Sequence, residues 1–329
     1  MSRVLVTGAG GFIGSYLVSR LKRAGHWVRG VDLKHPEFAP TEADEFLVAD
    51  LRDRSAASTS CAGVEQIYAL AADMGGMGYI SLHHAEILHN NSLINLHSLD
   101  AAREHGVARY LFTSSACVYP EYLQEGVDLK PLREEDVLPA QPQDAYGWEK
   151  LVTEQLCLHY GREYEMETRI VRFHNIFGPL GTWEGGREKA PAAMCRKVAR
   201  AKLMGERTIE IWGDGLQTRS FCYVDDCLEG MMRLMDSSYG EPLNLGQDRL
   251  ISINELADMV CAIAGVELQK KHVSGPQGVR GRNSDNTRLR QVLDWEPAIS
   301  LEDGLTRTYT WIEEQVRLQL GQVVGAGVR

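Results

Sequence analysis

Short apolar runs alternate with longer amphipathic segments along the first half of the chain. Runs rich in β-branched and other apolar residues predict strands, and apolar residues at helical spacing predict helices between them. The segment up to Arg23 and the segment Ala85–His105 are examples of the expected helices. The expected strands are Arg3–Thr7, Trp27–Asp32, Phe46–Asp50, Gln66–Ala71, Arg109–Ser115 and Thr168–Phe173. Strands that alternate with helices indicate an α/β fold with a parallel sheet covered on both faces.

The character of the sequence changes after Phe173, where Gly, Trp, Pro and Arg become frequent. We expect residues 1–173 to form the first domain, with later residues, about 217–247, returning to it. Residues 174–320 are expected to form mainly a smaller, loop-rich α/β region that binds the substrate. Residues 321–329 are expected to be a frayed tail.

A glycine-rich turn, TGAGGFIG from Thr7 to Gly14, joins the first expected strand to the first expected helix. Gly8 permits the tight turn, Gly11 lets a pyrophosphate approach the backbone, and Gly14 allows close packing of helix on strand. The helix N-terminus offers free N–H groups to the phosphates. This motif predicts a Rossmann-like, doubly wound sheet that binds a dinucleotide.

Asp32 ends the second expected strand, eighteen residues after Gly14. A carboxylate there bonds both ribose hydroxyls and repels a 2′-phosphate, which favours NAD over NADP. A turn aspartate is the alternative. Asp50 and Leu51 end the third strand, where an adenine ring would lie. Asp50 is then either an acceptor for the adenine amino group or a plain turn residue.

Charge and cysteine content exclude several classes of protein. The 329-residue chain has a net charge of −10, so it carries no broad positive field for nucleic acid or for an anionic membrane. No stretch approaches the roughly 18 to 20 apolar residues of a membrane span, and no signal peptide is visible. Seven cysteines without a Cys-x-x-Cys pair argue against disulfides and structural zinc and favour a cytoplasmic setting. Histidines 83, 84, 89 and 97 lack the spacing of a metal site, so no metal is expected.

Tyr146 and Lys150 stand four residues apart, which places a phenol and an ammonium on one helix face. Asp144 is the expected N-cap of this helix. The ammonium favours the phenolate, so the tyrosine can act as a base nearer neutral pH than its free pKa of about 10 allows. Ser114 and Ser115 end a strand, and Ser115 can bond the same substrate oxygen that Tyr146 deprotonates.

Together these motifs resemble the extended short-chain dehydrogenase/reductase family of nucleotide-sugar enzymes. The segments RFHNIFGP from Arg172 and RSFCYVD from Arg219 belong to the same resemblance, which extends to about Trp311. It implies a nucleotide-sugar substrate and a tightly held NAD that is recycled. The expected cofactor-binding residues are Gly8, Gly11, Phe12, Ile13, Gly14, Asp32, Asp50, Leu51, Ala71, Tyr146 and Lys150.

Six longer segments are similar to a narrower group, the GDP-mannose 3,5-epimerase family. They read ADMGGMGYI (72–80), SSACVYPE (114–121), PQDAYGWEK (142–150), RFHNIFGPLGTWEGGREKAPAAMCRK (172–197), WGDGLQTRSF (212–221) and GPQGVRGRNSDN (275–286). The resemblance implies GDP-mannose as substrate, with GDP-L-galactose as product and GDP-L-gulose from inversion at C5 alone. It also implies transient oxidation at C4, which makes C3 and C5 acidic, followed by reduction at C4.

The same resemblance assigns the acid and the base for inversion to Cys117 and Lys189. Cys117 lies two residues past Ser115, and Lys189 lies in a glycine-rich loop that could close over the sugar. For these roles, Cys117 needs thiolate character and Lys189 a lowered pKa. The alternatives are a buried small side chain for the cysteine and a solvated surface lysine. The expected catalytic residues are Tyr146, Lys150, Ser115, Cys117 and Lys189.

Arg219 and Arg280 are the expected diphosphate clamps, because guanidinium groups pair with phosphate oxygens. Arg282 and Lys197 are second candidates, and surface salt bridges are the alternative role of all four. Asn175 suits a bond to the sugar or the phosphate. The full expected substrate set is Gly76, Met77, Ser115, Asn175, Glu188, Lys189, Lys197, Gln217, Arg219 and Arg280.

Three other functions are weighed against this expectation. A nucleotide-sugar 4-epimerase needs no additional acid–base pair, so Cys117 and Lys189 argue against it. A 4,6-dehydratase usually has an Asp-Glu pair where this chain has Ala116 and Cys117. A non-catalytic NAD-sensing protein typically loses the Tyr or the Lys of the motif. By family analogy, the helices of residues 85–105 and 146–160 are expected to pair in a homodimer.

Overall fold

The central element is a seven-stranded sheet in which all neighbouring strands are parallel. The structure, a computed structural model, describes residues 1–326, with side chains through Gly321. In spatial order the strands are β11 (Pro242–Leu245), β6 (Glu167–Phe173), β5 (Arg109–Ser115), β4 (Gln66–Ala69), β1 (Arg3–Thr7), β2 (Trp27–Asp32) and β3 (Glu45–Val48). The order 3-2-1-4-5-6 is that of a Rossmann fold, so the predicted fold class is confirmed.

Two predicted strands end earlier than expected, and the side chains at their ends explain why. β3 stops at Val48, because Asp50 instead accepts a hydrogen bond from the Arg52 amide in a turn. β4 stops at Ala69, because the next two amides, those of Leu70 and Ala71, donate to the Thr7 hydroxyl. At each place these hydrogen bonds turn the chain away from the sheet at its carboxyl edge, where a ligand can lie.

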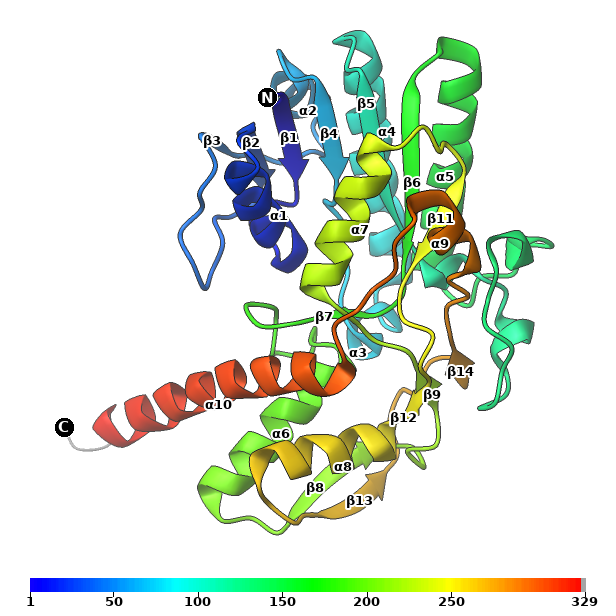
Figure 1. The fold of residues 1–329 in the computed structure, drawn as a ribbon. Helices are drawn as coiled ribbons and strands as arrows, with labels where there is room; N and C mark the ends of the chain where they lie inside the picture. The colour runs from blue at the N-terminus through cyan, green and yellow to red at the C-terminus, as the bar shows by residue number, and fades with distance from the viewer. Residues whose placement is uncertain (327–329) are drawn as a thin grey trace.

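Helices cover both faces of the sheet (Figure 1). One face carries α1 (Phe12–Arg23) and α7 (Val224–Asp236), whose apolar side chains share a core with Val4 and Val6 of β1. The other face carries α2 (Arg54–Cys61), α4 (His84–Glu104) and α5 (Ala145–Tyr164), which share a second core with Leu5. Successive residues of β1 thus point to opposite faces, as in any strand buried on both sides.

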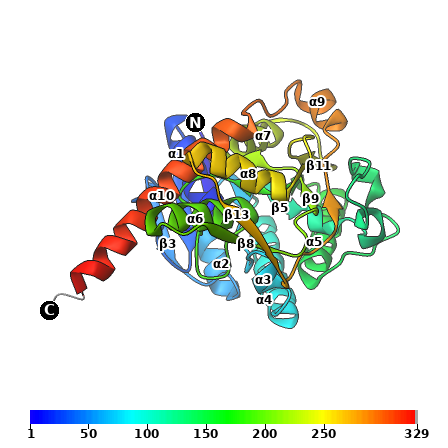
Figure 2. The same ribbon diagram turned by 90° about the horizontal axis from the view of Figure 1, so that it is seen from below.

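A smaller region lies beyond the carboxyl ends of the strands, at the bottom of Figure 1. It contains α6 (Ala190–Met204), α8 (Ile253–Ala264), α10 (Leu301–Ala326) and the parallel pair of β8 (Thr208–Trp212) and β13 (Gln269–Val273). Figure 2 views the same elements from below, with α10 extending away from the body. Residues 321–326 continue this long helix, whose earlier turns pack on α6 and α8. Residues 327–329 of the expected tail lie outside the described residues.

Short elements connect the two regions. α7 and β11 lie with the sheet, whereas several short segments before and after them form small strands outside it. These are β7 (Ile176–Phe177) paired with β10 (Cys222–Tyr223), and the set β12 (Ile251–Ser252), β9 (Thr218–Arg219) and β14 (Gly281–Arg282). Two short helices, α3 (Met77–Ile80) and α9 (Thr287–Leu293), complete the elements that bear on the site, with a 3-10 turn at Ala116–Val118 after β5. Within residues 1–326, every helix is too short or too polar to cross a bilayer.

Candidate active site

Two glycines of the turn after β1 lie so close to neighbouring backbone that a side chain would not fit. Gly8 has a φ of +70°, and a Cβ there would lie 2.9 Å from the Ala71 nitrogen. A Cβ at Gly14 would lie 2.1 Å from the Gly8 oxygen, so only glycine lets α1 start this close to the turn. The first turn of α1 has neither a side-chain cap nor an acidic residue. Its amide groups are therefore in place for the pyrophosphate of a dinucleotide.

Gly10, which the sequence analysis did not single out, joins this turn to Asp32. The Gly10 amide donates to one Asp32 oxygen at 2.9 Å, and a Cβ at Gly10 would lie 2.1 Å from the Lys34 oxygen. The carboxylate is thus fixed at the end of β2, beside the turn, where the ribose of NAD is recognised. The sequence did carry a signal for Gly10, which is the second of the four glycines in the motif. The glycine turn and Asp32 together fit NAD.

The other expected cofactor residues use their side chains mainly within the protein. Asp50 pairs with Arg52 at 2.6 Å, and this hydrogen bond lowers the pKa of the Asp50 carboxyl. Leu51 is buried in the core beneath β2. The Phe12 ring lies against Gly178 and Gly181, and so packs the glycine turn against the segment after β7. Contacts of Asp50, Leu51, Phe12 and Ile13 with the cofactor stay predictions.

Tyr146 and Lys150 lie side by side at the start of α5, and both are buried. Asp144 caps this helix as predicted, accepting from the Gly147 amide at 2.8 Å. The Lys150 ammonium lies 5.4 Å from the centre of the Tyr146 ring and 3.6 Å from a carboxylate oxygen of Glu149.

The electrostatic effect on Tyr146 is the opposite of the one that the Tyr-x-x-x-Lys spacing predicts. Burial, together with the negative charge of Glu149, raises the pKa of Tyr146 well above 10, while a hydrogen bond with Ser115 lowers it slightly. Burial is the largest cause of this shift, and the charge of Glu149 adds to it. The sequence analysis missed Glu149, since the spacing of the motif gives no role to the residue between.

Cys117 is held next to Tyr146 by a close backbone approach. The Ser115 hydroxyl accepts from the Cys117 amide at 3.2 Å, which begins the 3-10 turn after β5. A Cβ at Gly147 would lie 2.2 Å from the Cys117 oxygen, so α5 and this turn touch at a glycine. The predicted catalytic residues Ser115, Cys117 and Tyr146 are therefore brought together in space.

Positive groups surround the Cys117 thiol, which is partly buried. An Arg282 nitrogen lies 3.2 Å from its sulfur, and another nitrogen of the same guanidinium bonds Gln124 at 2.6 Å. The guanidinium is thus aimed at the sulfur and held in place by Gln124. Sequence reasoning assigned Arg282 only to phosphate. Nothing in the sequence links it to a cysteine 165 positions away.

Lys189 enters the same group from the loop that precedes α6, where it is the N-cap residue. Burial lowers the pKa of its ammonium, in the direction that the sequence predicts, while the charges of Cys117 and Cys227 oppose this shift. Within residues 1–326 its ammonium has no hydrogen-bond or ion-pair partner among the contacts of the fold. A half-buried ammonium with a lowered pKa gives up its proton more readily than a free lysine does.

The Lys189 loop rests on the loop after β4. The Gly76 amide donates to the Arg187 oxygen at 2.9 Å, and a Cβ at Gly76 would lie 2.4 Å from the Glu188 oxygen. The Glu188 carboxylate bonds Arg196 and the Gly186 amide, each at 2.7 Å. Glu188 therefore shapes the loop, and direct binding of substrate by its side chain stays a prediction. Met77 begins α3, and its sulfur lies close to Gly278.

Among the expected diphosphate-binding residues, Arg219 has the contacts that best suit a bound phosphate. Its guanidinium bonds the carbonyl oxygens of Thr218, Gln277 and Val279, and its described contacts include no carboxylate. Burial, with the nearby charge of Arg282, lowers the pKa of Arg219 to about 9. A half-buried guanidinium without a carboxylate partner favours a bound anion.

The other expected substrate residues are engaged in the fold. Arg280 forms a two-pronged pair with Asp214, with distances of 2.8 and 2.6 Å, so the expected clamp is closed on a carboxylate. The Lys197 ammonium donates to the Glu210 oxygen at 2.6 Å, and Asn175, at φ +47°, donates to the Ser220 oxygen at 2.9 Å. Gln217 donates to the Trp212 oxygen, while its own side-chain oxygen is buried without a partner.

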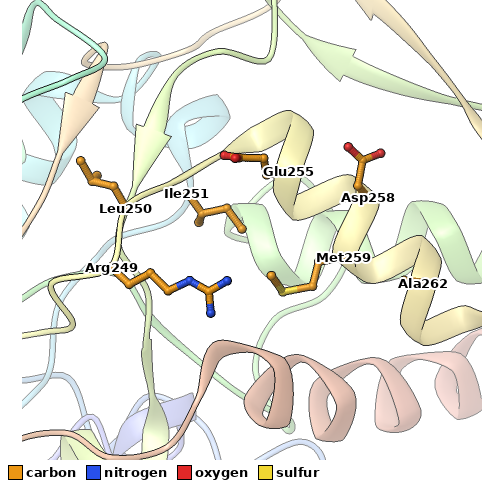
Figure 3. Close-up of a pocket in the computed structure, with 7 residues that line it drawn as sticks. All are labelled: Arg249, Leu250, Ile251, Glu255, Asp258, Met259 and Ala262. Atoms are coloured by element: carbon orange, nitrogen blue, oxygen red, sulfur yellow. The ribbon is translucent and has the colours of Figure 1, made fainter.

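A surface pocket elsewhere carries none of this chemistry. It lies between α8 and residues 249–251 (Figure 3), and it is lined by Arg249, Leu250, Ile251, Glu255, Asp258, Met259 and Ala262. Arg249 is paired with Glu302 of α10 at 2.8 Å. None of the predicted site residues lines this pocket.

Comparisons with known proteins agree with the site. Residues 4–246 match the family described as "NAD dependent epimerase/dehydratase family". The chain is 49% identical to GDP-mannose 3,5-epimerase 1 of Oryza sativa subsp. japonica over 324 residues, covering 98% of this chain and 84% of that protein. It is 49% identical to GDP-mannose 3,5-epimerase of Arabidopsis thaliana over 316 residues, covering 95% and 83%. Among solved structures, UDP-glucose 4-epimerase from Thermotoga maritima with UDP-glucose superposes with a TM-score of 0.85 at 27% identity, covering 95% of this chain and 99% of that one.

Proposed function

The chain belongs to the NAD dependent epimerase/dehydratase family, and from that premise we propose that it is a GDP-mannose 3,5-epimerase. It converts GDP-D-mannose to GDP-L-galactose, with GDP-L-gulose from inversion at C5 alone. The observation that supports the proposal is that Cys117 lies next to Tyr146 and that Lys189 lies near enough to Cys117 for their charges to interact. A 4-epimerase has no use for this second proton-transfer pair, and Ala116 and Cys117 replace the acidic pair that elimination requires.

Chemistry at C4 falls to Tyr146 and Ser115. Tyr146 takes the proton of the C4 hydroxyl and later returns it, while the Ser115 hydroxyl bonds the same oxygen. When bound, NAD supplies a reversible two-electron acceptor for the C4–H bond. The glycine turn and Asp32 would hold NAD, and Lys150 lies where it can bond the nicotinamide ribose. The sugar is oxidised and reduced in turn, so no net redox change results.

Chemistry at C5 and C3 falls to Cys117 and Lys189. A 4-ketone makes the neighbouring C–H bonds acidic through an enolate, and inversion needs a base on one ring face and an acid on the other. Cys117 comes from the end of β5, whereas Lys189 comes from the loop before α6. The two groups therefore approach the ring from different elements, as opposite faces require.

The region after Phe173 is proposed to bind the GDP group of the substrate. Arg219 is proposed to bond the diphosphate oxygens. Replacing Arg219 by Met is expected to raise the KM for GDP-mannose about 10- to 100-fold, the equivalent of one or two charge-assisted hydrogen bonds, with little change in kcat. Steady-state kinetics measure both constants. Arg249→Met removes an arginine far from the site and is the matched control. An unchanged KM in the Arg219 variant would remove Arg219 from the substrate site.

The reaction itself is tested by proton NMR of GDP-mannose with the purified protein in D₂O, without added cofactor. Deuterium at C5 and C3, with new galactose or gulose signals, is the expected result, and it also shows that NAD co-purifies. Exchange at C5 alone would limit the enzyme to one centre. Absence of exchange, even with added NAD, would reject GDP-mannose as the substrate.

A homodimer through α4 and α5 is part of the proposal. These helices pack on each other and expose apolar side chains, with Leu88 and Leu96 on α4 and Trp148 and Val152 on α5. The double substitution Leu88→Lys with Val152→Lys is expected to convert the protein to a monomer, measured by sedimentation. Leu318→Lys, at an exposed position of α10, is the control and leaves the mass unchanged. A wild-type protein that sediments as a monomer would contradict this assembly.

A cytoplasmic location is also proposed. It is supported by the seven cysteines, which are all free thiols, six of them buried.

A further inference from the structure

A buried carboxylate lies against the catalytic lysine, and the mechanism above gives it no task. Glu149 is 1% exposed and Lys150 is 2% exposed, with 3.6 Å between a Glu149 oxygen and the ammonium nitrogen. Burial of an ionised carboxylate is costly unless it is both paired and hydrogen-bonded. A residue with such a cost, next to the catalytic group, calls for a functional explanation.

Two neutral amides from the neighbouring helix hold this carboxylate in place. Asn91 of α4 donates to one Glu149 oxygen at 2.9 Å, and Asn95, one turn later, donates to the other at 3.0 Å. Asn95 also donates to the Thr153 hydroxyl at 3.1 Å. Burial raises the pKa of the Glu149 carboxyl, while Lys150 and the hydrogen bonds from both asparagines oppose this rise. Both carboxylate oxygens are thus fixed by donors, which keeps the group directed at Lys150.

The Lys150 ammonium is fixed on its other sides by aromatic rings. Its nitrogen lies 4.8 Å from the centre of the Phe112 ring and 5.4 Å from that of Tyr146. Aromatic faces attract a cation without neutralising it. Glu149 is therefore the group that compensates the lysine charge within this enclosed space.

We propose that Glu149 is a positioning residue: it holds Lys150 in place and cancels its charge, so that the ionisation of Tyr146 depends on the charge of the bound cofactor. The inference rests on the proposed function. The oxidised nicotinamide ring is positive and its reduced form is neutral. With Lys150 compensated, Tyr146 takes up the C4 proton when the cofactor is oxidised and keeps it while the sugar is a ketone. The stored proton then returns to C4 in the final reduction, and the cycle balances.

The other groups that face this pair do not replace Glu149. They are Asn91 and Asn95 from α4, Phe112 and Ser115 from β5, Cys117 from the following turn, and Asp144 and Glu154 on α5 itself. Asp144 is used in capping α5, and Glu154 bonds Arg172 through both of its oxygens. Cys117 is compensated by Arg282.

The test is the substitution Glu149→Gln, which keeps the shape of the side chain and removes the charge. Tyrosine labelled with ¹³C at Cζ reports the ionisation of each ring by NMR, and Tyr146→Phe assigns the Tyr146 signal. In the wild-type protein without substrate and with its cofactor reduced to the neutral form, the signal is expected to stay that of a phenol throughout the alkaline range that the fold tolerates. In Glu149→Gln it is expected to titrate about one to three pH units lower, because Lys150 is then uncompensated.

A second variant keeps the inference open to refutation if Glu149→Gln does not fold. Glu149→Asp retains the charge but shortens its reach, so the Tyr146 signal is expected to shift in the same direction by a smaller amount. Glu154→Gln removes a different buried charge of α5, and it is expected to leave the Tyr146 signal unmoved. An unchanged Tyr146 titration in the folded Glu149 variants would overturn the proposal.

The titration separates this inference from the proposed function. It observes Tyr146 directly and needs no substrate. A wild-type protein that exchanges no proton of GDP-mannose, but whose Tyr146 shifts in Glu149→Gln, would reject the substrate and retain the role of Glu149. The pH profile of oxidation at C4, followed by the absorbance of the reduced nicotinamide, gives a second readout, since its acidic limb is expected to move to lower pH in Glu149→Gln.

Discussion

Replacing Lys189 by Ala is expected to slow deuterium exchange at C5 and C3 by about 10²- to 10⁴-fold, the usual contribution of a general acid or base. Burial lowers the pKa of the Lys189 ammonium below its ordinary value, which favours the free amine that a base requires. At lower pH the amine is protonated and fails as a base, so exchange in the wild-type protein should fall as the pH drops. Loss of the side chain removes this proton transfer entirely.

The expected defect of the Lys189 variant is confined to one part of the reaction. Tyr146 and Ser115 are untouched, so oxidation at C4 should persist, seen as absorbance of the reduced nicotinamide when GDP-mannose is added. Bound NAD, measured after release by denaturation, should match that of the wild-type protein.

Two further substitutions sharpen the test. Lys189→Arg keeps the positive charge but cannot give up its proton, so it should be nearly as defective as Lys189→Ala. Lys202→Ala removes another lysine of α6, which pairs with Glu313 at 3.1 Å, and should leave exchange unchanged. Near-normal exchange in Lys189→Ala would mean that another group carries the proton.

Replacing Tyr146 by Phe is expected to abolish both oxidation at C4 and exchange at C5 and C3, each by about 10²- to 10⁴-fold. The phenol is the group in place to take the C4 proton, and without a ketone the neighbouring C–H bonds do not become acidic. The two variants therefore differ in one measurement. Reduced nicotinamide forms in Lys189→Ala but not in Tyr146→Phe.

Tyr110→Phe is the matched control for Tyr146→Phe. Tyr110 is also a buried tyrosine, on β5, and its hydroxyl has no hydrogen-bond partner in the described structure. Loss of that hydroxyl should leave the reaction unchanged and the fold at least as stable. Transient reduction of the cofactor at a normal rate in Tyr146→Phe would remove Tyr146 from the mechanism.

Local patterns in the sequence predicted the frame of the molecule and much of its cofactor site. The strands β1, β2 and β5 have the predicted bounds, because a buried parallel strand is a continuous apolar run that can be read directly. The glycine turn and the Asp144 cap are likewise visible, since each depends on residues only a few positions apart. Such features require no knowledge of distant contacts.

The partners of charged side chains were not predictable in this way. Arg280 was expected to be free for phosphate, yet it pairs with Asp214, 66 positions away. Lys197 and Asn175 likewise donate to backbone oxygens of other segments. A guanidinium or an ammonium can pair with any acceptor that the fold brings near, and the sequence does not list those neighbours in space.

The sequence by itself determined the fold class and the glycine turn that fits the cofactor, because glycine turns and helix spacing act over short distances. Only the tertiary structure decided which charged and polar groups face the predicted reacting side chains. Arg282 reaches Cys117 from another region, and α4 supplies the two amides that hold Glu149 beside Lys150. The proton affinities of Tyr146 and Lys189 follow from burial and from neighbouring charges, and both arise only when distant segments pack together.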